Sequence, residues 1–216
     1  MLLNFSVENY KSISDRVNLD LTPSNSIRKF KEHIVHDDSG AKALRGAIIC
    51  GSNAAGKSNV IKAMSYAKKV ALNKRTKKLG TGIPQFRYHE DSENNFSRFE
   101  FEFSNNGKIY AYGFILDRKE IHEEWLYLIN KDGVERKLFT RKLDLDEMLI
   151  AFGEYLLLDE DEEQLLFLAN KTVTKNTLYL HHVSQLNIVD KLNNHMKNVV
   201  DWLDNKLIVV YPESRY

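Results

Sequence analysis

The 216 residues, 43% of them apolar, are enough to bury a hydrophobic core in one large domain or two small ones. The 31 lysine and arginine residues nearly balance 30 acidic residues, so the overall charge of +1 argues neither for nor against a nucleic-acid partner. The single Cys50 excludes an internal disulfide, and no apolar run approaches the roughly 20 residues that cross a bilayer. We therefore expect a cytoplasmic protein that does not insert into membranes.

The chain opens with two stretches of alternating apolar and polar residues, 2–10 and 13–21, joined by turn-compatible residues. This pattern predicts a β-hairpin over 1–21. Residues 22–42 are polar and lack a period, which indicates a surface excursion. Residues 46–50 form a short continuous apolar run, typical of a strand buried on both faces.

A helix is predicted over 57–73, so that 43–75 would form a strand–loop–helix unit. Its apolar side chains recur at helical spacing and would form one buried face. They are Val60, Ile61, Met64, Ala67, Val70 and Ala71.

The region 95–142 is the clearest β segment of the sequence. Phe99, Phe101 and Phe103 alternate with charged residues, and Asn-Gly at 106–107 and Asp-Gly at 132–133 are typical hairpin turns. We expect an antiparallel meander with one face in water. Residues 143–211 should be mainly helical, most visibly at 188–204, and end in a strand at 207–211 before Pro212.

The pattern G-x-x-x-x-G-K-[S/T] is met by Gly51, Gly56, Lys57 and Ser58. Glycines let successive N–H groups of the loop turn toward phosphate oxygens, and the start of a helix adds a positive dipole end. The lysine would neutralise β- and γ-phosphate charge, and the serine hydroxyl would bind Mg²⁺. We predict that this loop binds a nucleoside triphosphate, ATP with Mg²⁺, rather than serving only as a glycine turn between strand and helix. Its nucleotide-binding residues would also include Ser52, Asn53, Ala54, Ala55 and Asn59.

The run from Gly51 to Asn59 resembles the loop of ABC-type ATPases of the RecF, SMC and OLD kind. It is most similar to the AAA-type ATPases that accompany bacterial abortive-infection and anti-phage nucleases. The opening Phe-Ser-Val-Glu-Asn-Tyr-Lys-Ser at 5–12 is similar to the first strand of that group. The resemblance implies that Lys11 and Ser12 lie beside the nucleotide. It extends to 99–103, 112–114, 123–127 and 176–180.

The resemblance also implies a fold and partners. The expected fold is an α/β P-loop NTPase core, ABC-ATPase-like, with an antiparallel β subdomain and C-terminal helices, covering the first half of a family member. The expected partners are a second copy through the ATPase heads and a nuclease or effector subunit. In such proteins a glutamine senses Mg²⁺ and the γ-phosphate, and Gln85 stands at a comparable place, although a loop glutamine is more often merely solvated.

ABC-type hydrolysis also needs a Walker B acid pair and a signature loop, and no Leu-Ser-Gly-Gly sequence occurs. Residues 155–160 imitate a Walker B, with Asp159 as metal partner and Glu160 as catalytic base. The alternative is that these acids begin a helix, where they oppose the dipole. We favour the helix start.

A cluster of cations follows the predicted helix and would suit phosphate contacts with DNA or RNA. Cations at a helix C-terminus are also ordinary dipole complements on a solvated face, and we favour this second interpretation. The cluster comprises Lys68, Lys69, Lys74, Arg75, Lys77 and Lys78. The adjacent His181 and His182 have no ligand spacing for zinc.

Three functions remain open at this point. The leading one is the ATP-binding half of an ABC-type ATPase. The second is a P-loop kinase for a small molecule, disfavoured by the residues that precede the loop. The third is a non-hydrolysing, nucleotide-gated scaffold. A GTPase is disfavoured because residues 170–173 fail the Asn-Lys-x-Asp pattern.

Overall fold

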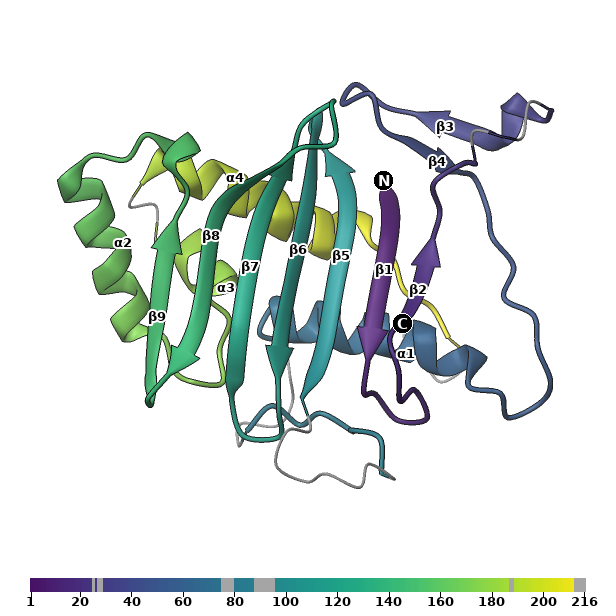
Figure 1. Ribbon diagram of the computed structural model, residues 1–216, viewed down its shortest axis with the longest axis horizontal. Coiled ribbons are helices and arrows are strands. Elements are labelled where there is room, and N and C mark those ends of the chain that lie inside the picture. Colours follow the sequence, from purple (N-terminus) through teal and green to yellow (C-terminus); the bar gives the residue numbers. More distant parts are fainter. Residues whose placement is uncertain (25, 27–28, 75–79, 88–95, 187–188, 212–216) are drawn as a thin grey trace.

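The computed structural model describes residues 1–24, 26, 29–74, 80–87, 96–186 and 189–211. Its centre is a seven-stranded sheet of order β2-β1-β5-β6-β7-β8-β9, in which every neighbouring pair is antiparallel (Figure 1). A separate two-stranded sheet, β3 (Ile34–His36) with β4 (Lys42–Leu44), follows the 3₁₀ turn η1 (Lys31–His33). The strands of the main sheet are β1 (Leu2–Glu8), β2 (Val17–Asp20), β5 (Ser97–Asn105), β6 (Lys108–Leu116), β7 (Ile121–Ile129), β8 (Glu135–Asp144) and β9 (Glu147–Phe152).

The opening hairpin and the meander are confirmed. Phe99, Phe101 and Phe103 are fully buried on one face of β5, while the residues between them are only partly buried. Asn106 and Gly107 have φ of 49° and 71°, the left-handed pair that a two-residue hairpin turn requires. The alternation in sequence therefore sets which face of the sheet meets the core.

Helices cover that inner face (Figure 1). Helix α1 (Lys57–Ala71) buries Val60, Met64 and Ala67, which belong to its predicted apolar face. Helix α4 (Asp190–Asp201) buries Leu192, Met196 and Val199, and it continues into the π-helical turn η3 (Trp202–Lys206). Ile188, which we placed in the same helix, lies outside the described residues. The short α3 (Tyr179–Ser184) packs beside α4, and α2 (Glu160–Thr172) follows the turn η2 (Glu154–Leu156) and packs against β9.

The expectation that the chain becomes mainly helical from residue 143 was wrong at its start. Strand β9 pairs with β8 from Asp144↔Glu147 to Phe139↔Phe152. The turn between them is made by Leu145 and Asp146 at φ of 41° and 70°. Asp146 is a common turn residue but Leu145 is not, and the pair lacks the glycine that marks the Asn-Gly and Asp-Gly turns earlier in the chain.

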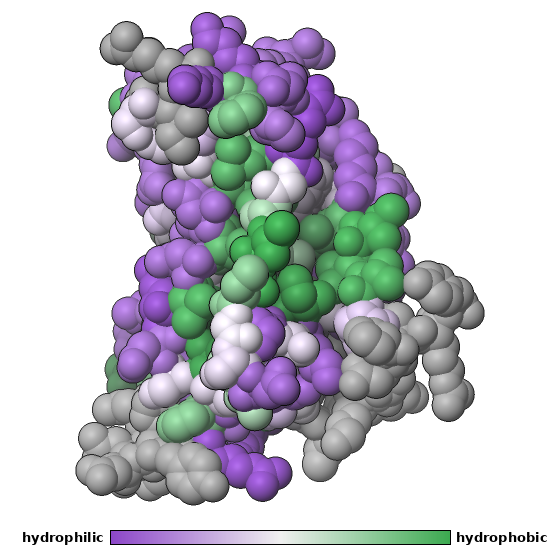
Figure 2. All heavy atoms as spheres, turned by 90° about the vertical axis from the view of Figure 1, so that its right-hand side faces the viewer, coloured by the Kyte–Doolittle hydropathy of each residue, from purple (hydrophilic) through white to green (hydrophobic). Residues whose placement is uncertain are grey.

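Two further predicted strands are absent. Residues 46–50 and 207–211 have no strand assignment, and Ile48 and Ile208 are 90% and 79% exposed. Among the described residues no strand pairs with either segment, and a strand needs a partner for its backbone groups. The side of the molecule that carries β2 and the 45–56 connection shows a band of hydrophobic residues in Figure 2. The exposed large hydrophobic residues here are Val17 of β2, Leu44 at the end of β4, and Ile48 and Ile49 of the connection.

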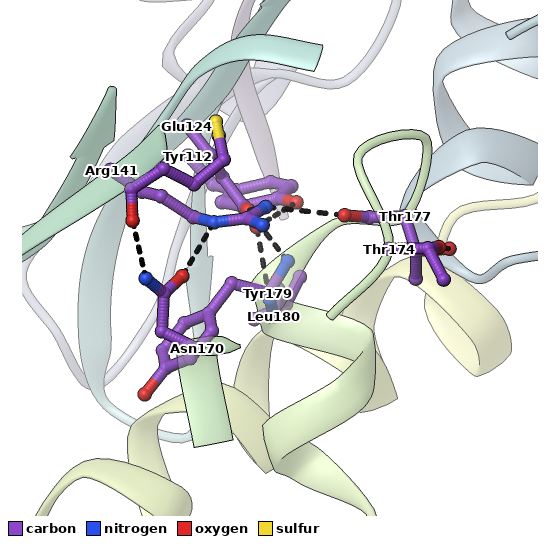
Figure 3. Close-up of polar contacts among 9 residues, drawn as sticks. Tyr112, Glu124, Arg141, Asn170, Thr174, Thr177, Tyr179 and Leu180 are labelled. Carbon is purple, nitrogen blue, oxygen red and sulfur yellow. Dashed lines mark hydrogen bonds and ion pairs between the residues drawn. The ribbon is translucent and has the colours of Figure 1, made fainter. Parts of the chain in front are cut away.

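A polar cluster inside the core fixes α3 to the sheet (Figure 3). The carboxylate of Glu124 on β7 accepts hydrogen bonds from the backbone N–H groups of Tyr179 (2.6 Å) and Leu180 (2.9 Å). The guanidinium of Arg141 on β8 lies 3.7 Å from the same carboxylate, and its Nε donates to Asn170 at 2.7 Å. Burial raises the pKa of Glu124, while Arg141 and the N–H donors act to lower it. The pair thus stabilises the start of α3 within the core.

Within its described part the chain has no helix that is both long and apolar enough to cross a membrane.

Candidate nucleotide site

The glycine loop ends at the first residue of α1. Gly56 is the N-cap, with φ of 84° and ψ of 4°, and no acidic residue lies in the first turn of the helix. Ala54 also has a left-handed backbone, with φ of 64°. The positive end of the helix dipole therefore faces the loop without a carboxylate to oppose it. Residues 54–59 line a concavity of about 220 Å³ at this point.

The Lys57 ammonium binds backbone carbonyl groups of its own loop. It donates hydrogen bonds to the carbonyl oxygens of Gly51 at 2.8 Å and Ser52 at 2.6 Å. Ser58 is exposed in the first turn of the helix. The described residues that line the concavity thus offer N–H groups, one ammonium and one hydroxyl without a carboxylate, a donor set that fits a triphosphate with Mg²⁺. Contact of residues 51–59 with a nucleotide stays a prediction.

The turn between β1 and β2 lies against the start of α1. Lys11 has a left-handed backbone, with φ of 52°. The amide of Asn59 donates to the Ser12 hydroxyl at 2.6 Å, and a Cβ added to Gly56 would lie 2.8 Å from that hydroxyl oxygen. Gly56 is therefore needed for its φ and for this close approach. The structure brings the Ser12 hydroxyl beside the end of the loop, whereas the contact of Lys11 and Ser12 with a nucleotide stays a prediction.

A second cavity of about 590 Å³ adjoins the first and shares Asn59 with it. Lys11, Ser12, Gln85, Arg87 and Arg118 line it together with Asn59. The segment that carries Gln85 is held in place because Lys11 N–H donates to the carbonyl of Pro84 at 2.7 Å. Gln85 is buried, not solvated as a typical loop residue would be. Its role toward Mg²⁺ stays a prediction.

Sequence reasoning missed Arg87 and Arg118 as members of this site. Arg118 lies in the turn between β6 and β7. Its backbone carbonyl accepts a hydrogen bond of 3.0 Å from the N–H of Thr81. No motif joins this turn to the glycine loop, and only the folded sheet brings the two together. Local sequence held no signal for either arginine.

Asp159 and Glu160 stand at the start of α2. Asp159 is the N-cap and accepts from Glu162 N–H at 2.9 Å, while the Glu162 carboxylate accepts from Asp159 N–H at 3.1 Å. This reciprocal pair is a capping box, so the helix start that we favoured is present. Helix α2 packs on β9, at the opposite edge of the sheet from β1 and β2 (Figure 1). The structure does not bring these acids to the glycine loop.

Two lysines of the cationic cluster bind the C-terminal part of the chain. Lys68 donates to the carbonyls of Asp204 and Leu207, and Lys74 forms an ion pair of 2.5 Å with the Asp204 carboxylate. Burial lowers the pKa of Lys68. Arg75, Lys77 and Lys78 lie outside the described residues. A nucleic-acid role for this cluster stays a prediction.

The histidines singled out in the sequence do not form a metal site. His182 hydrogen-bonds the Thr172 hydroxyl at 2.8 Å. In the described part of the chain, no group of three or more His, Cys, Asp or Glu side chains could hold a metal ion.

Comparison with known families identifies the family of the chain. A family model described as an AAA domain, putative AbiEii toxin, of a type IV toxin–antitoxin system matches residues 47–212, a range that contains the glycine loop and α1. The chain belongs to this family. The AbiEii-type AAA domain is a P-loop ATPase domain that binds nucleotide, and its predicted α/β fold class is confirmed. A search of curated proteins found no match.

Proposed function

We propose that this AbiEii-type AAA domain binds ATP with Mg²⁺ at residues 51–59 and acts as the ATPase or sensor component of a bacterial anti-phage defence system, together with a nuclease. The observation that carries the proposal is the start of α1. There, Gly56, the Lys57 ammonium and an unopposed helix N-terminus meet at one concavity. The assignments to the RecF, SMC and OLD subtype and to phage defence rest on sequence resemblance. Family membership shows only that the chain is an AbiEii-type AAA domain.

Each residue of the loop has a distinct part in binding. Lys57 would exchange its two bonds to loop carbonyls for bonds to β- and γ-phosphate oxygens, gaining charge attraction in the exchange. Ser58 would offer its hydroxyl to Mg²⁺, which neutralises phosphate charge when bound. Gly56 keeps the backbone close to the phosphates because it has no side chain. Asn59 keeps the Ser12 turn against the helix.

Among the described residues, none that lines either cavity carries a carboxylate. Hydrolysis by a P-loop ATPase needs a group that positions the attacking water. We infer that a carboxylate base for turnover comes from outside these residues, as from a second copy in a homo-oligomer of ATPase heads. The same observation favours, as a second candidate, a nucleotide-gated scaffold that binds ATP without hydrolysing it.

Calorimetry with Mg·ATP tests the proposal on the wild type, Lys57→Ala and a matched control, Lys69→Ala. Lys69 is exposed near the other end of the same helix. We expect Lys57→Ala to weaken binding by about 100-fold, because charge-assisted hydrogen bonds are lost, and Lys69→Ala to leave it unchanged. Equal affinities in all three proteins would overturn the assignment. Hydrolysis on the same samples separates the two candidates, since only the ATPase turns over ATP when a second copy is present at high concentration.

A further inference from the structure

Strand β9 and helix α2 lie together at one edge of the sheet, opposite β1 and β2 (Figure 1). We call the exposed part of residues 143–170 the β9–α2 surface. Six leucine and phenylalanine side chains of this segment are exposed, although each is large and apolar. They are Leu145, Leu149, Leu157, Leu165, Phe167 and Leu168.

A groove of about 440 Å³ gathers part of these side chains at one place, between β9 and the last turns of α2. Leu149 of β9 and Phe167 of α2 line it and are 52% and 38% exposed. Leu168, which is 60% exposed, lies one helical turn before Lys171, another residue of the lining. The opposite face of α2 buries Leu166 in the core. The helix therefore has a second apolar face, which is typical of a surface that a partner covers.

The β9–α2 surface is also strongly negative. Residues 143–170 contain nine acidic residues and no lysine or arginine, although the whole chain has a net charge of +1. Within the part of the chain that the structure describes, only two of the nine form ion pairs, Asp146 with Lys175 and Glu162 with Lys191. Lys171 and Lys175 line the groove near the C-terminal end of α2. The acids at the start of α2 thus leave an excess of negative charge beside the groove.

This charge disfavours several occupants of the groove. Nucleic acids and anionic lipid surfaces carry the same sign of charge and would be repelled. A second copy related by a two-fold axis would place the same acids against themselves. Addition of a strand to β9 is disfavoured because the Asn170 side-chain amide already donates to the carbonyl of Met148 at 2.6 Å.

We propose that the β9–α2 surface binds a basic amphipathic helix of a partner protein. Apolar side chains of that helix would enter the groove between Leu149 and Phe167, and its lysines or arginines would face the acids at the start of α2. Burial of apolar side chains supplies affinity, while the charges select the partner and its orientation. The proposal goes beyond the ATP site and does not depend on it, because the glycine loop lies toward the other edge of the sheet.

Fluorescence anisotropy with the full chain tests the proposal. The probe is a labelled model peptide in which leucines at helical spacing form one face and lysines form the other. A scrambled peptide of the same composition and a peptide with glutamate in place of lysine are the controls. We expect the wild type to bind the first peptide at least about tenfold more tightly than either control, since only the first presents an apolar face together with positive charge.

Two pairs of variants locate the binding surface. Leu149→Gln with Leu168→Gln should weaken binding of the model helix by about tenfold or more, because apolar burial is lost. The matched control, Val134→Gln with Ile208→Gln, replaces two exposed apolar residues elsewhere and should change the affinity less than twofold. All four residues are exposed, so the fold should tolerate these substitutions.

A second pair tests the charge separately. Asp161→Asn with Glu163→Gln should weaken binding by about fivefold at low salt, and the effect should shrink as salt is added. Its control removes two exposed acids outside the surface, by Asp132→Asn with Glu135→Gln, and should have little effect.

Three results would overturn the proposal. The first is no binding of the model helix, or equal binding of the scrambled peptide. The second is an equal loss in the surface variants and their controls. The third is a wild-type dimer in sedimentation that Leu149→Gln with Leu168→Gln converts to monomers, because a second copy would then cover the surface. The titrations contain no nucleotide, so a failure of the ATP assignment at Lys57 would leave their outcome unchanged.

Discussion

The side-chain amide of Asn59 donates a hydrogen bond of 2.6 Å to the hydroxyl of Ser12, which joins the first turn of α1 to the β1–β2 turn. The same hydroxyl oxygen is the nearest atom to the position that a Cβ on Gly56 would take, at 2.8 Å. The glycine loop, the start of the helix and the first hairpin are therefore held together through one serine. A substitution in any of these three segments should therefore alter the packing of the other two.

Gly56→Ala should destabilise the protein more than Gly40→Ala. The two glycines have nearly the same φ, 84° and 85°, so each substitution costs about 1–2 kcal/mol for the positive φ. Only at Gly56 would the new methyl group also push Ser12 off its hydrogen bond with Asn59, since nothing lies within 4 Å at Gly40. That bond adds about 1 kcal/mol.

Urea denaturation of the two variants measures the difference. Ser12→Ala added to Gly56→Ala should reduce the excess, because it removes the oxygen that the methyl group meets. Equal losses at the two glycines, or an excess that Ser12→Ala leaves in place, would contradict the contact. ATP binding should also fall in Gly56→Ala and remain intact in Gly40→Ala.

Glu124→Gln should destabilise the fold by about 3–5 kcal/mol, because it leaves the Arg141 charge buried without a counter-charge. Both side chains are 0% exposed. The neighbouring pair Glu123 and Lys142 lies on the same two strands at 3.1 Å, with the lysine side chain 71% exposed, so Glu123→Gln should cost less than about 1 kcal/mol.

Thermal and urea unfolding of the two variants gives the comparison. Adding Arg141→Met to Glu124→Gln should recover part of the loss, since the unpaired charge is then gone. Similar losses for Glu123→Gln and Glu124→Gln would show that the buried pair does not anchor α3. A neutral amide oxygen accepts hydrogen bonds from the N–H groups of Tyr179 and Leu180 more weakly than a carboxylate does. The start of α3 should therefore fray first.

The sequence was most informative where structure depends on neighbours along the chain. Alternation at Phe99, Phe101 and Phe103 predicted the buried face of β5, and the helical spacing of Val60 and Met64 predicted the buried face of α1. The glycine loop was recognisable because its backbone demands particular residues at particular positions. These features need no knowledge of distant segments.

The failures concern contacts between distant segments. Residues 46–50 have the composition of a buried strand, but a strand also needs a partner, which a local pattern cannot supply. Strand β9 was missed because its turn is made by Leu145 and Asp146 and not by a pair that contains glycine, such as Asn106 and Gly107. Arg118 reached the candidate site only because the β6–β7 turn lies beside the segment that contains Thr81.

Asp159→Ala and Glu160→Gln distinguish a helix cap from a Walker B pair. Asp159 accepts from Glu162 N–H as the N-cap of α2, so Asp159→Ala should lower the free energy of unfolding by about 1 kcal/mol, whereas Asp159→Ser should keep most of it. Glu160→Gln should have a smaller effect. None of the three should change the affinity for Mg·ATP or the rate of hydrolysis, because α2 lies at the far edge of the sheet from the loop. If Asp159 were instead a Mg²⁺ ligand and Glu160 a catalytic base, Glu160→Gln would abolish turnover. Asp159→Ser would then restore stability without restoring activity. Urea unfolding and a phosphate-release assay on the same preparations decide between these outcomes.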